Sequence, residues 1–404
     1  MKKINYIICI CIISVLLGGS TVLGSYVSIP TWSNDTIVTS VNDEEKGNFL
    51  ELESGSAILI EQNSGEILYE HNIHEKLRPA SVTKVMSILL VMEAIERGEL
   101  NMDDKLSCSE EAAKMGGSQI WLEPNEEMTV SDLLKSVCVV SANDAVYCLA
   151  ENIAGSEEAF VERMNQRAKE LGMNDTTFKN CHGIDEDGHE TSSYDISIMS
   201  RELLTKHPQI TEYTTIWMDS IRDGQSELVN TNKLIRNYSG ATGLKTGSTS
   251  LALFNLSASA TRDNMSLIAV IMRAPSSQIR FSEARKLLDY GFSNYQYNEF
   301  TKEGEKFSDI EIQKGIENSI EAVYEKTAGN IVKKGSTDNI EQEVLIDNNI
   351  MAPIEKGQKV GEVRFKIENE VIETVNLISN NSVKKISTWN MVTYIYKKWF
   401  NLIR

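Results

Sequence analysis

Apolar and polar residues follow two different periods along the chain, and the change of period divides it into regions. Apolar runs at residues 56–60 and 67–69 flank the polar sequence Asn63-Ser64-Gly65-Glu66. Short apolar runs on either side of a glycine-containing turn are typical of a β-hairpin. From Pro79 to about Lys206 apolar residues recur every three or four positions, which is the spacing of one helix face. We therefore expect a hairpin followed by a helix-rich region.

Strands are predicted again after the helical region. Apolar runs at residues 253–258 and 267–272 predict two strands, and helical spacing returns from Ser277 to Tyr290. A sheet built from both ends of a domain, with helices from its middle, belongs to the α+β class. Beyond about Gly291, β-rich runs alternate with Gly-Asn, Lys-Gly and Asp-Asn-Asn turns, which predicts a small all-β second domain.

The N-terminal residues differ in composition from the rest of the chain. Residues 1–24 carry Lys2 and Lys3, then an apolar run over residues 7–17, then small residues. This is the pattern of a secretory signal peptide. An uncleaved anchor helix is the alternative, although the apolar run is shorter than a bilayer span. Residues 25–49 are polar and acidic and indicate a flexible leader, so we expect an exported protein.

The C-terminal residues 376–404 are basic and are predicted to form an amphipathic helix. Apolar and aromatic residues occupy one broad side of that helix, and the basic residues fall elsewhere: Lys384, Lys385, Lys397, Lys398 and Arg404. Such a helix lies in the headgroup region of a membrane and does not span it. We expect it to hold the protein on the outer face of the cell membrane. A helix docked on the protein's own β domain is the alternative.

Charge and cysteine content exclude some classes of function. The net charge is −18 at pH 7, and the acidic body has no basic patch, which argues against a nucleic-acid partner. Four cysteines lie beyond the predicted signal peptide, at Cys108, Cys138, Cys148 and Cys181. They form neither a Cys-x-x-Cys pair nor a metal-type spacing with histidine. A disulfide stays open, and buried free thiols are the favoured interpretation.

Ser81 and Lys84 are the candidate nucleophile and base. They stand three residues apart at the start of a predicted helix, so they share a face and the amine can reach the hydroxyl. A lysine accepts a proton only when neutral, and both burial and the nearby charge of Lys245 would lower its pKa. The same spacing recurs at Ser382 and Lys385, where no further motif follows, and we interpret that match as chance.

Two further motifs follow Ser81 in a fixed order, namely Ser141-Ala142-Asn143 and Lys245-Thr246-Gly247. With these motifs the chain resembles the low-molecular-weight penicillin-binding proteins that act as serine-type D-alanyl-D-alanine carboxypeptidases of peptidase family S11. The resemblance covers about residues 50–375. It implies a β-lactamase/transpeptidase-like catalytic domain, an antiparallel sheet with helices, at residues 50–292. It also implies a small β-rich domain at 293–375, before the helix at 376–404.

The resemblance also implies roles for the candidate residues. Ser81 would attack the carbonyl between the two terminal D-alanines of a peptidoglycan stem peptide, with Lys84 as base and Ser141 as proton relay. β-Lactam antibiotics would then be covalent inhibitors. The remaining candidates bind substrate: Asn143 at its amide, Lys245, Thr246, Gly247 and Arg280 around its carboxylate, and Ser248 with Ser81 as oxyanion-hole amides. The resemblance implies no metal and no cofactor.

Some positions leave alternatives open. Leu253 stands where relatives usually carry glycine, and its side chain would crowd the neighbouring strand and slow turnover. A β-lactamase is one alternative function, although no Glu-x-x-Leu-Asn sequence follows the second motif. A non-catalytic penicillin-binding cell-wall protein is another.

The histidines give no metal-binding motif. His182 and His189 bracket an acidic loop that we interpret as a wall of the active-site cleft, with a cation site as the alternative. We expect His71, His74 and His207 at the surface or in loops.

Overall fold

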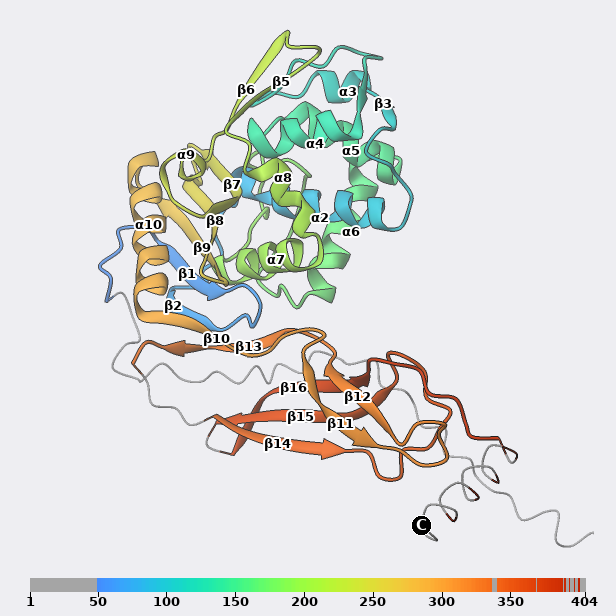
Figure 1. The fold of residues 1–404 in the computed structure, drawn as a ribbon. Coiled ribbons are helices and arrows are strands. Elements are labelled where there is room, and N and C mark those ends of the chain that lie inside the picture. Colours follow the sequence, from blue (N-terminus) through green and yellow to red (C-terminus); the bar gives the residue numbers. More distant parts are fainter. Residues whose placement is uncertain are drawn as a thin grey trace, which may run out of the picture. The chain divides into compact units, whose positions relative to one another are not determined.

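The computed structural model describes residues 49–335, 340–367 and 369–387 of the chain, together with Trp389, Val392, Tyr396 and Trp399 (Figure 1). The predicted signal peptide and all but the last residue of the predicted leader lie outside the described residues. The same is true of 13 of the 29 residues of the predicted C-terminal helix, all of them beyond residue 387.

A five-stranded antiparallel sheet forms the centre of the first domain, with strand order β2-β1-β9-β8-β7. Its strands are β1 (Ser56–Glu61), β2 (Ile67–His71), β7 (Ala241–Thr249), β8 (Leu253–Arg262) and β9 (Met265–Ala274). The predicted hairpin is confirmed as β1 and β2, and β1 pairs directly with β9, so both ends of the domain meet in one sheet. The α+β class is therefore confirmed.

Helices cover both faces of this sheet (Figure 1). They are η2 (Ala80–Thr83), α2 (Lys84–Glu96), α3 (Glu110–Ala113), α4 (Val130–Val139), α5 (Asn143–Ala154), α6 (Glu157–Glu170), α7 (Ser193–Lys206), η3 (Pro208–Ile210), α8 (Thr211–Thr214), α9 (Leu234–Asn237) and α10 (Ser277–Asn294). Two two-stranded sheets complete the domain: β3 (Lys105–Ser107) with β4 (Glu127–Thr129), and β5 (Met218–Ile221) with β6 (Ser226–Val229).

Alternate residues of the central strands enter two different cores. Ile58 and Ile60 of β1 belong to the core formed with the helices between β2 and β7. Ala57 and Leu59 belong to the core on the other face, formed with Leu287 and its neighbours on α10. Because side chains alternate along a strand, a strand that is apolar at every position is buried on both faces. This explains why residues 57–60 form a continuous apolar run.

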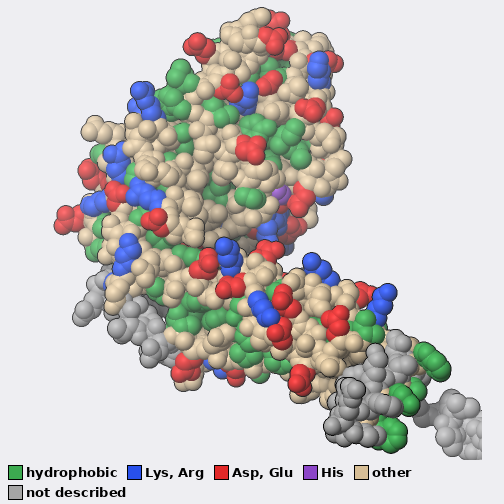
Figure 2. Space-filling view, viewed as in Figure 1, with side chains coloured by type: hydrophobic (Ala, Val, Ile, Leu, Met, Phe, Trp, Pro, Cys, Tyr) green, Lys and Arg blue, Asp and Glu red, His purple; other side chains and the backbone are tan. Residues whose placement is uncertain are grey.

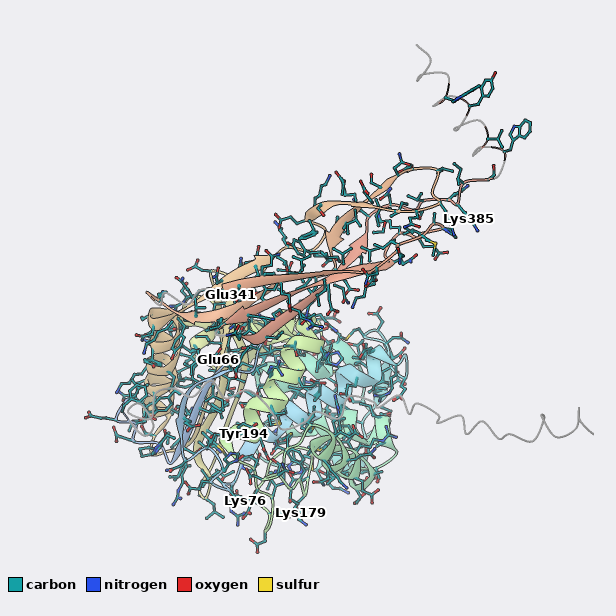
Figure 3. All side chains as sticks on the ribbon, turned by 90° about the horizontal axis from the view of Figure 1, so that it is seen from below. Glu66, Lys76, Lys179, Tyr194, Glu341 and Lys385 are labelled. Atoms are coloured by element: carbon teal, nitrogen blue, oxygen red, sulfur yellow. The ribbon has the colours of Figure 1, made fainter. Side chains whose placement is uncertain are left out.

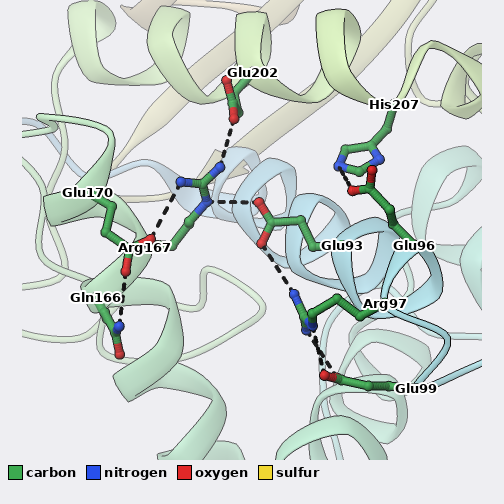
Figure 4. A network of polar contacts seen from close by, with 9 residues as sticks. All are labelled: Glu93, Glu96, Arg97, Glu99, Gln166, Arg167, Glu170, Glu202 and His207. Carbon is green, nitrogen blue, oxygen red and sulfur yellow. Dashed lines mark hydrogen bonds and ion pairs between the residues drawn. The ribbon is translucent and has the colours of Figure 1, made fainter. Parts of the chain in front are cut away.

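An ion-pair network ties the helices around α2 together (Figure 4). Arg167 on α6 donates to Glu93 on α2 at 2.8 Å and to Glu202 on α7 at 2.7 Å. A partly buried network of this kind holds more strongly than an isolated surface pair. His207 lies nearby with its Nε2 4.0 Å from a carboxylate oxygen of Glu96, and it is buried. His207 lies in the connection between α7 and η3, as a loop position was expected, but it is buried and not at the surface.

The second domain is all β, as predicted. Its five-stranded sheet has the order β11-β12-β16-β15-β14, and a two-stranded sheet pairs β10 with β13. The strands are β10 (Tyr295–Thr301), β11 (Lys306–Glu311), β12 (Ser319–Tyr324), β13 (Ala328–Lys333), β14 (Ile340–Ile346), β15 (Lys359–Ile367) and β16 (Glu370–Ser379). Ile320, Val363, Val375 and Leu377 form part of a separate core.

The β structure extends beyond the predicted boundary at residue 375. Strand β16 runs to Ser379, Val383 bridges Ile354, and Lys385 (labelled in Figure 3) bridges Gly315. Residues 376–379 therefore belong to the sheet and not to a terminal helix. The second Ser-x-x-Lys sequence lies in this paired segment, which supports its interpretation as a chance match. No helix within the described part of the chain is long and apolar enough to cross a membrane.

Acidic and basic side chains are interspersed on the face of the molecule seen in Figure 2. This face therefore offers no continuous basic surface of the kind that nucleic acids bind.

Candidate active site

Ser81 lies in the 3-10 turn η2 that leads directly into α2. The predicted helix therefore exists, but its first turn is tighter than an α-helix. Asn255 on β8 holds the chain that enters this turn, because its Nδ2 donates to the carbonyl oxygens of Arg78 and Pro79 at 2.8 and 3.0 Å. Asn255 is fully buried. The sequence analysis missed it, and the one available signal was a polar residue within a mostly apolar strand.

Lys84 is completely buried beneath Ser81. Its Nζ lies 3.1 Å from Ser81 Oγ and 2.6 Å from both Asn143 Oδ1 and the carbonyl oxygen of His182. Burial, together with the charge of Lys245, lowers the pKa of Lys84 well below its ordinary value. A neutral amine has two N–H groups and one lone pair. With two carbonyl-type acceptors bound, the lone pair is left for the Ser81 hydroxyl.

Ser141 lies in the connection between α4 and α5, and Asn143 is the first residue of α5. Ser141 has a φ of +66°, is buried, and its Oγ has no hydrogen-bond partner among the described residues. Asn143 accepts from Lys84, and its Nδ2 donates to the carbonyl oxygen of Gly116 at 2.6 Å. The second hydrogen of that Nδ2 is left for a substrate carbonyl. The structure thus brings the second motif to the base.

Strand β7 brings the third motif to the nucleophile. A methyl group on Gly247 would stand 2.8 Å from the carbonyl oxygen of Pro79 and 2.9 Å from the amide nitrogens of Ser81 and Val82. Real methyl groups do not approach backbone atoms this closely, so only glycine fits here. The next residue, Ser248, is exposed at the same edge. The amides of Ser81 and Ser248 therefore lie on adjoining segments, as an oxyanion hole requires.

Two buried cations lie behind this edge of the site. Lys245 is buried, and its burial, together with the charge of Arg280, lowers its pKa to about 7. Arg280 donates to the carbonyl oxygens of Gly247 and Asn255 at 3.0 and 3.1 Å, and burial lowers its pKa to about 10. Arg280 therefore braces the strand that carries Lys245. Thr246 is held by a 2.7 Å hydrogen bond to Thr231.

The loop between His182 and His189 forms a wall of the site, as predicted. His182 supplies the carbonyl oxygen that accepts from Lys84, and a side chain on Gly183 would overlap the backbone of Ala80. His189 binds the hydroxyl of Thr83 at 2.7 Å. Burial lowers the pKa of His182 to about 3 and that of His189 to about 4, so both rings are neutral.

Lys76 and Lys179, both labelled in Figure 3, lie beside strand bridges to the residues just after His189, because Leu77 bridges Thr191 and Thr177 bridges Glu190. Among the described residues, no group of three or more His, Cys, Asp or Glu is placed to hold a metal ion.

The four cysteines of the described chain are buried and free. Cys181 precedes His182, and its amide donates to Glu157 Oε1 at 3.1 Å. This fixes the backbone whose next carbonyl binds Lys84. The favoured interpretation of the cysteines as buried thiols is confirmed.

Asp144, which follows the second motif, was not singled out from the sequence. It is fully buried, and one of its carboxylate oxygens accepts from the amides of Ile120 and Leu122, both at 3.1 Å. It therefore ties the loop at residues 116–122 to the start of α5, beside Asn143. The only sequence signal was an acidic residue within the motif region.

The family assignment rests on two matches that together span the described domains. A family described as D-alanyl-D-alanine carboxypeptidase matches residues 40–276. A second, described as penicillin-binding protein 5, C-terminal domain, matches residues 295–385. The chain belongs to the D-alanyl-D-alanine carboxypeptidase family. It is accordingly a hydrolase of the serine-peptidase type, with the penicillin-binding-protein fold of two domains.

Individual relatives agree with this assignment. The chain is 42% identical over 347 residues to D-alanyl-D-alanine carboxypeptidase DacF of Bacillus subtilis, covering 85% of this chain and 89% of that protein. It is similar to penicillin-binding protein 5 of Haemophilus influenzae, with a TM-score of 0.67, 30% identity, and coverage of 83% and 98%. It also matches penicillin-binding protein D2 of Listeria monocytogenes in its ampicillin-bound form, with a TM-score of 0.55, 31% identity, and coverage of 60% and 99%.

Proposed function

We propose that Ser81 removes the terminal D-alanine from peptidoglycan stem peptides through an acyl-enzyme. The observation that carries this proposal is the position of Lys84, which is completely buried with its Nζ 3.1 Å from Ser81 Oγ. Burial and the charge of Lys245 lower the pKa of Lys84, which favours the neutral amine that can take the proton of a serine hydroxyl. The family membership supplies the substrate class, and the geometry around Ser81 supports the roles proposed for the residues.

The reaction follows from these positions. Ser81 Oγ bonds to the carbonyl carbon between the two D-alanines and gives its proton to Lys84. The developing oxyanion accepts from the amides of Ser81 and Ser248, and each such donor is worth about 3 to 4 kcal/mol. Ser141, whose Oγ is buried, passes the proton to the leaving amine, and D-alanine departs. Water then adds to the ester carbonyl, and Ser81 recovers its proton.

Carboxylate recognition is the proposed role of the cationic corner around β7. Lys245 is buried, and a bound carboxylate would favour its charged form and raise its pKa from about 7. Thr246, whose hydroxyl donates to Thr231 in this structure, would add a donor to the carboxylate once that hydroxyl turns toward it. Arg280 contributes its charge while it holds the Gly247 carbonyl. A substrate that ends in a free carboxylate is therefore preferred over one that ends in an amide.

The test is to measure D-alanine release from diacetyl-L-lysyl-D-alanyl-D-alanine beside hydrolysis of benzylpenicillin by the same preparation. The proposal predicts D-alanine release together with a long-lived penicilloyl adduct. Rapid, repeated hydrolysis of benzylpenicillin without D-alanine release would indicate a β-lactamase. A stable adduct without D-alanine release would indicate a non-catalytic penicillin-binding protein.

We also propose that the mature protein is exported and held on the outer face of the cell membrane by its C-terminal residues. The support is the predicted signal peptide and four helical positions near the end of the chain, Trp389, Val392, Tyr396 and Trp399. They are spaced by three or four residues, and each is more than half exposed, at 58% to 77%. Exposed aromatic residues on one helix face are suited to a membrane interface.

Removing residues 388–404 tests this second proposal. The deletion spares the segment around Val383, which pairs with the β sheet. The full-length mature protein is expected to cosediment with anionic vesicles and to be released by salt, since each basic residue near the surface contributes about 1 kcal/mol. The truncated protein is expected to stay in solution with its D-alanine release unchanged. Equal vesicle binding by both forms would contradict the anchor.

A further inference from the structure

Trp121 combines an exposed ring with a backbone conformation that tryptophan rarely adopts. Its φ is +57°, and 68% of the residue is exposed to solvent. A bulky residue with positive φ is an outlier, and such strain costs of the order of 1 to 3 kcal/mol. It persists only where the surrounding structure imposes it, and it is concentrated at functional sites.

The neighbours of Trp121 impose this conformation from both sides. Buried Asp144 accepts from the amides on either side of it, those of Ile120 and Leu122. Arg222 donates to the carbonyl oxygen of Ile120 at 2.9 Å and to that of Trp121 at 3.3 Å. The backbone of this residue is thus held rigidly, although its own ring is exposed. A rigid, exposed aromatic face is suited to binding.

The loop that carries Trp121 is part of the active-site wall. Two carbonyl oxygens of the same loop accept hydrogen bonds from Asn143. The side chain of Asn143 donates to the carbonyl oxygen of Gly116, and its backbone amide donates to that of Ser118 at 2.7 Å. A stem peptide with its terminal carboxylate at Lys245 and its scissile bond at Ser81 extends its earlier residues past Asn143. The residue before D-Ala-D-Ala then comes to this loop.

The charge of the loop selects the chemistry of its ligand. Residues 109–127 hold five carboxylates, of which Glu110 pairs with Lys114 and Glu126 pairs with Arg222. Three carboxylates remain in excess, and one of them, Glu123, is exposed two residues after the tryptophan. An aromatic face in acidic surroundings attracts an ammonium group through the ring quadrupole. We propose that Trp121 binds the free side-chain ammonium of the diamino acid that precedes D-Ala-D-Ala. This deepens the proposed carboxypeptidase function and rests on it. It makes Trp121 a specificity residue for stems whose amine is not acylated.

The experiment compares two substrates, Nα-acetyl-L-lysyl-D-alanyl-D-alanine and its Nα,Nε-diacetyl form. The wild-type enzyme is expected to show a kcat/KM about two- to fivefold higher for the free amine. Trp121→Gly removes the ring at a φ that glycine adopts freely, and it is expected to abolish the preference. Trp121→Phe keeps a smaller aromatic ring and is expected to retain part of the preference for the free amine.

Controls separate recognition from a general defect. Acylation by benzylpenicillin, which carries no ammonium group, is expected to change less than twofold in both Trp121 variants. Met218→Ala, at another exposed apolar residue, is expected to leave the preference intact. A wild-type enzyme without preference overturns the inference. So does a Trp121→Gly loss that is equal for both peptides and benzylpenicillin. Failure of the wild type to cleave either peptide would instead overturn the proposed carboxypeptidase function.

Discussion

Gly247 lies so close to Ser81 that a methyl group on its α-carbon would stand 2.9 Å from the Ser81 amide nitrogen. The third motif is thus in contact with the turn that presents the nucleophile. The amide of Ser81 is one of the two proposed oxyanion donors, and Ser248, which follows Gly247, supplies the other. The distance between these segments therefore sets the geometry at which the oxyanion is bound.

Gly247→Ala is expected to lower the rate of acylation by roughly two orders of magnitude, because one of the two segments must move away. The rate of acylation by benzylpenicillin measures this effect directly. Gly116→Ala is the matched control, since nothing lies within 4 Å of the added methyl group there. Equal rates in the wild type and Gly247→Ala would show that the spacing of the two segments does not matter.

Leu253, the first residue of β8, provides a test of backbone strain beside the third motif. Its φ is +57°, which costs a residue other than glycine about 1 to 2 kcal/mol. Leu253→Gly and Leu253→Ala both remove the side chain, and we expect the glycine variant to be the more stable by about 1 kcal/mol. At an ordinary strand position, with negative φ, the alanine variant would be the more stable of the two. Urea unfolding measures the free energies of unfolding of the two variants. A more stable alanine variant would contradict a strained conformation at residue 253.

Lys245 makes the free energy of unfolding depend on pH. Its pKa is about 7 in the folded protein against an ordinary value of 10.5, so between these values the unfolded state binds one more proton. This contribution to stability therefore rises by about 1.4 kcal/mol per pH unit from pH 7 to 10. The Lys245→Met variant has no titrating group at this position and therefore lacks this pH-dependent contribution to stability. Urea titrations at pH 7, 8 and 9 are expected to show a shallower rise for the variant, and parallel slopes would contradict a buried neutral lysine.

Lys245→Gln tests carboxylate recognition. The variant is expected to lose kcat/KM for peptides with a free terminal carboxylate much more than for the same peptides ending in an amide, because it loses a charge-assisted contact. Lys233→Gln, on an exposed lysine, controls for a general loss of positive charge. Losses of equal size for the two peptides would assign Lys245 another role.

The sequence pattern correctly predicted those features that depend on residues close together in the chain. The hairpin of β1 and β2, the helix α10 and the pairing of Ser81 with Lys84 all depend on spacing within a few residues. Asn255 was missed because its partner Arg78 is 177 residues away. The same holds for His207, whose burial depends on helices that pack around it.

The end of the second domain was predicted too early, at residue 375. The residues that follow pair with segments far away in the sequence, since Val383 bridges Ile354 and Lys385 bridges Gly315. Strand β7 carries few apolar residues, and its burial results from contact with η2 and β8, which no periodicity shows. The arrangement around Ser81 was thus predicted as a set of residues, whereas their supports became visible only in the fold.

The central claim is that Ser81 is the nucleophile and that Lys84 activates it. Mass spectrometry of the benzylpenicillin-treated protein, followed by peptide mapping, tests this most directly. The wild type is expected to carry one penicilloyl group on the peptide that contains Ser81. Ser81→Ala is expected to carry none, and Lys84→Ala to be labelled at least about 100-fold more slowly. A penicilloyl group on Ser81→Ala, or on any other residue of the wild type, would contradict the account.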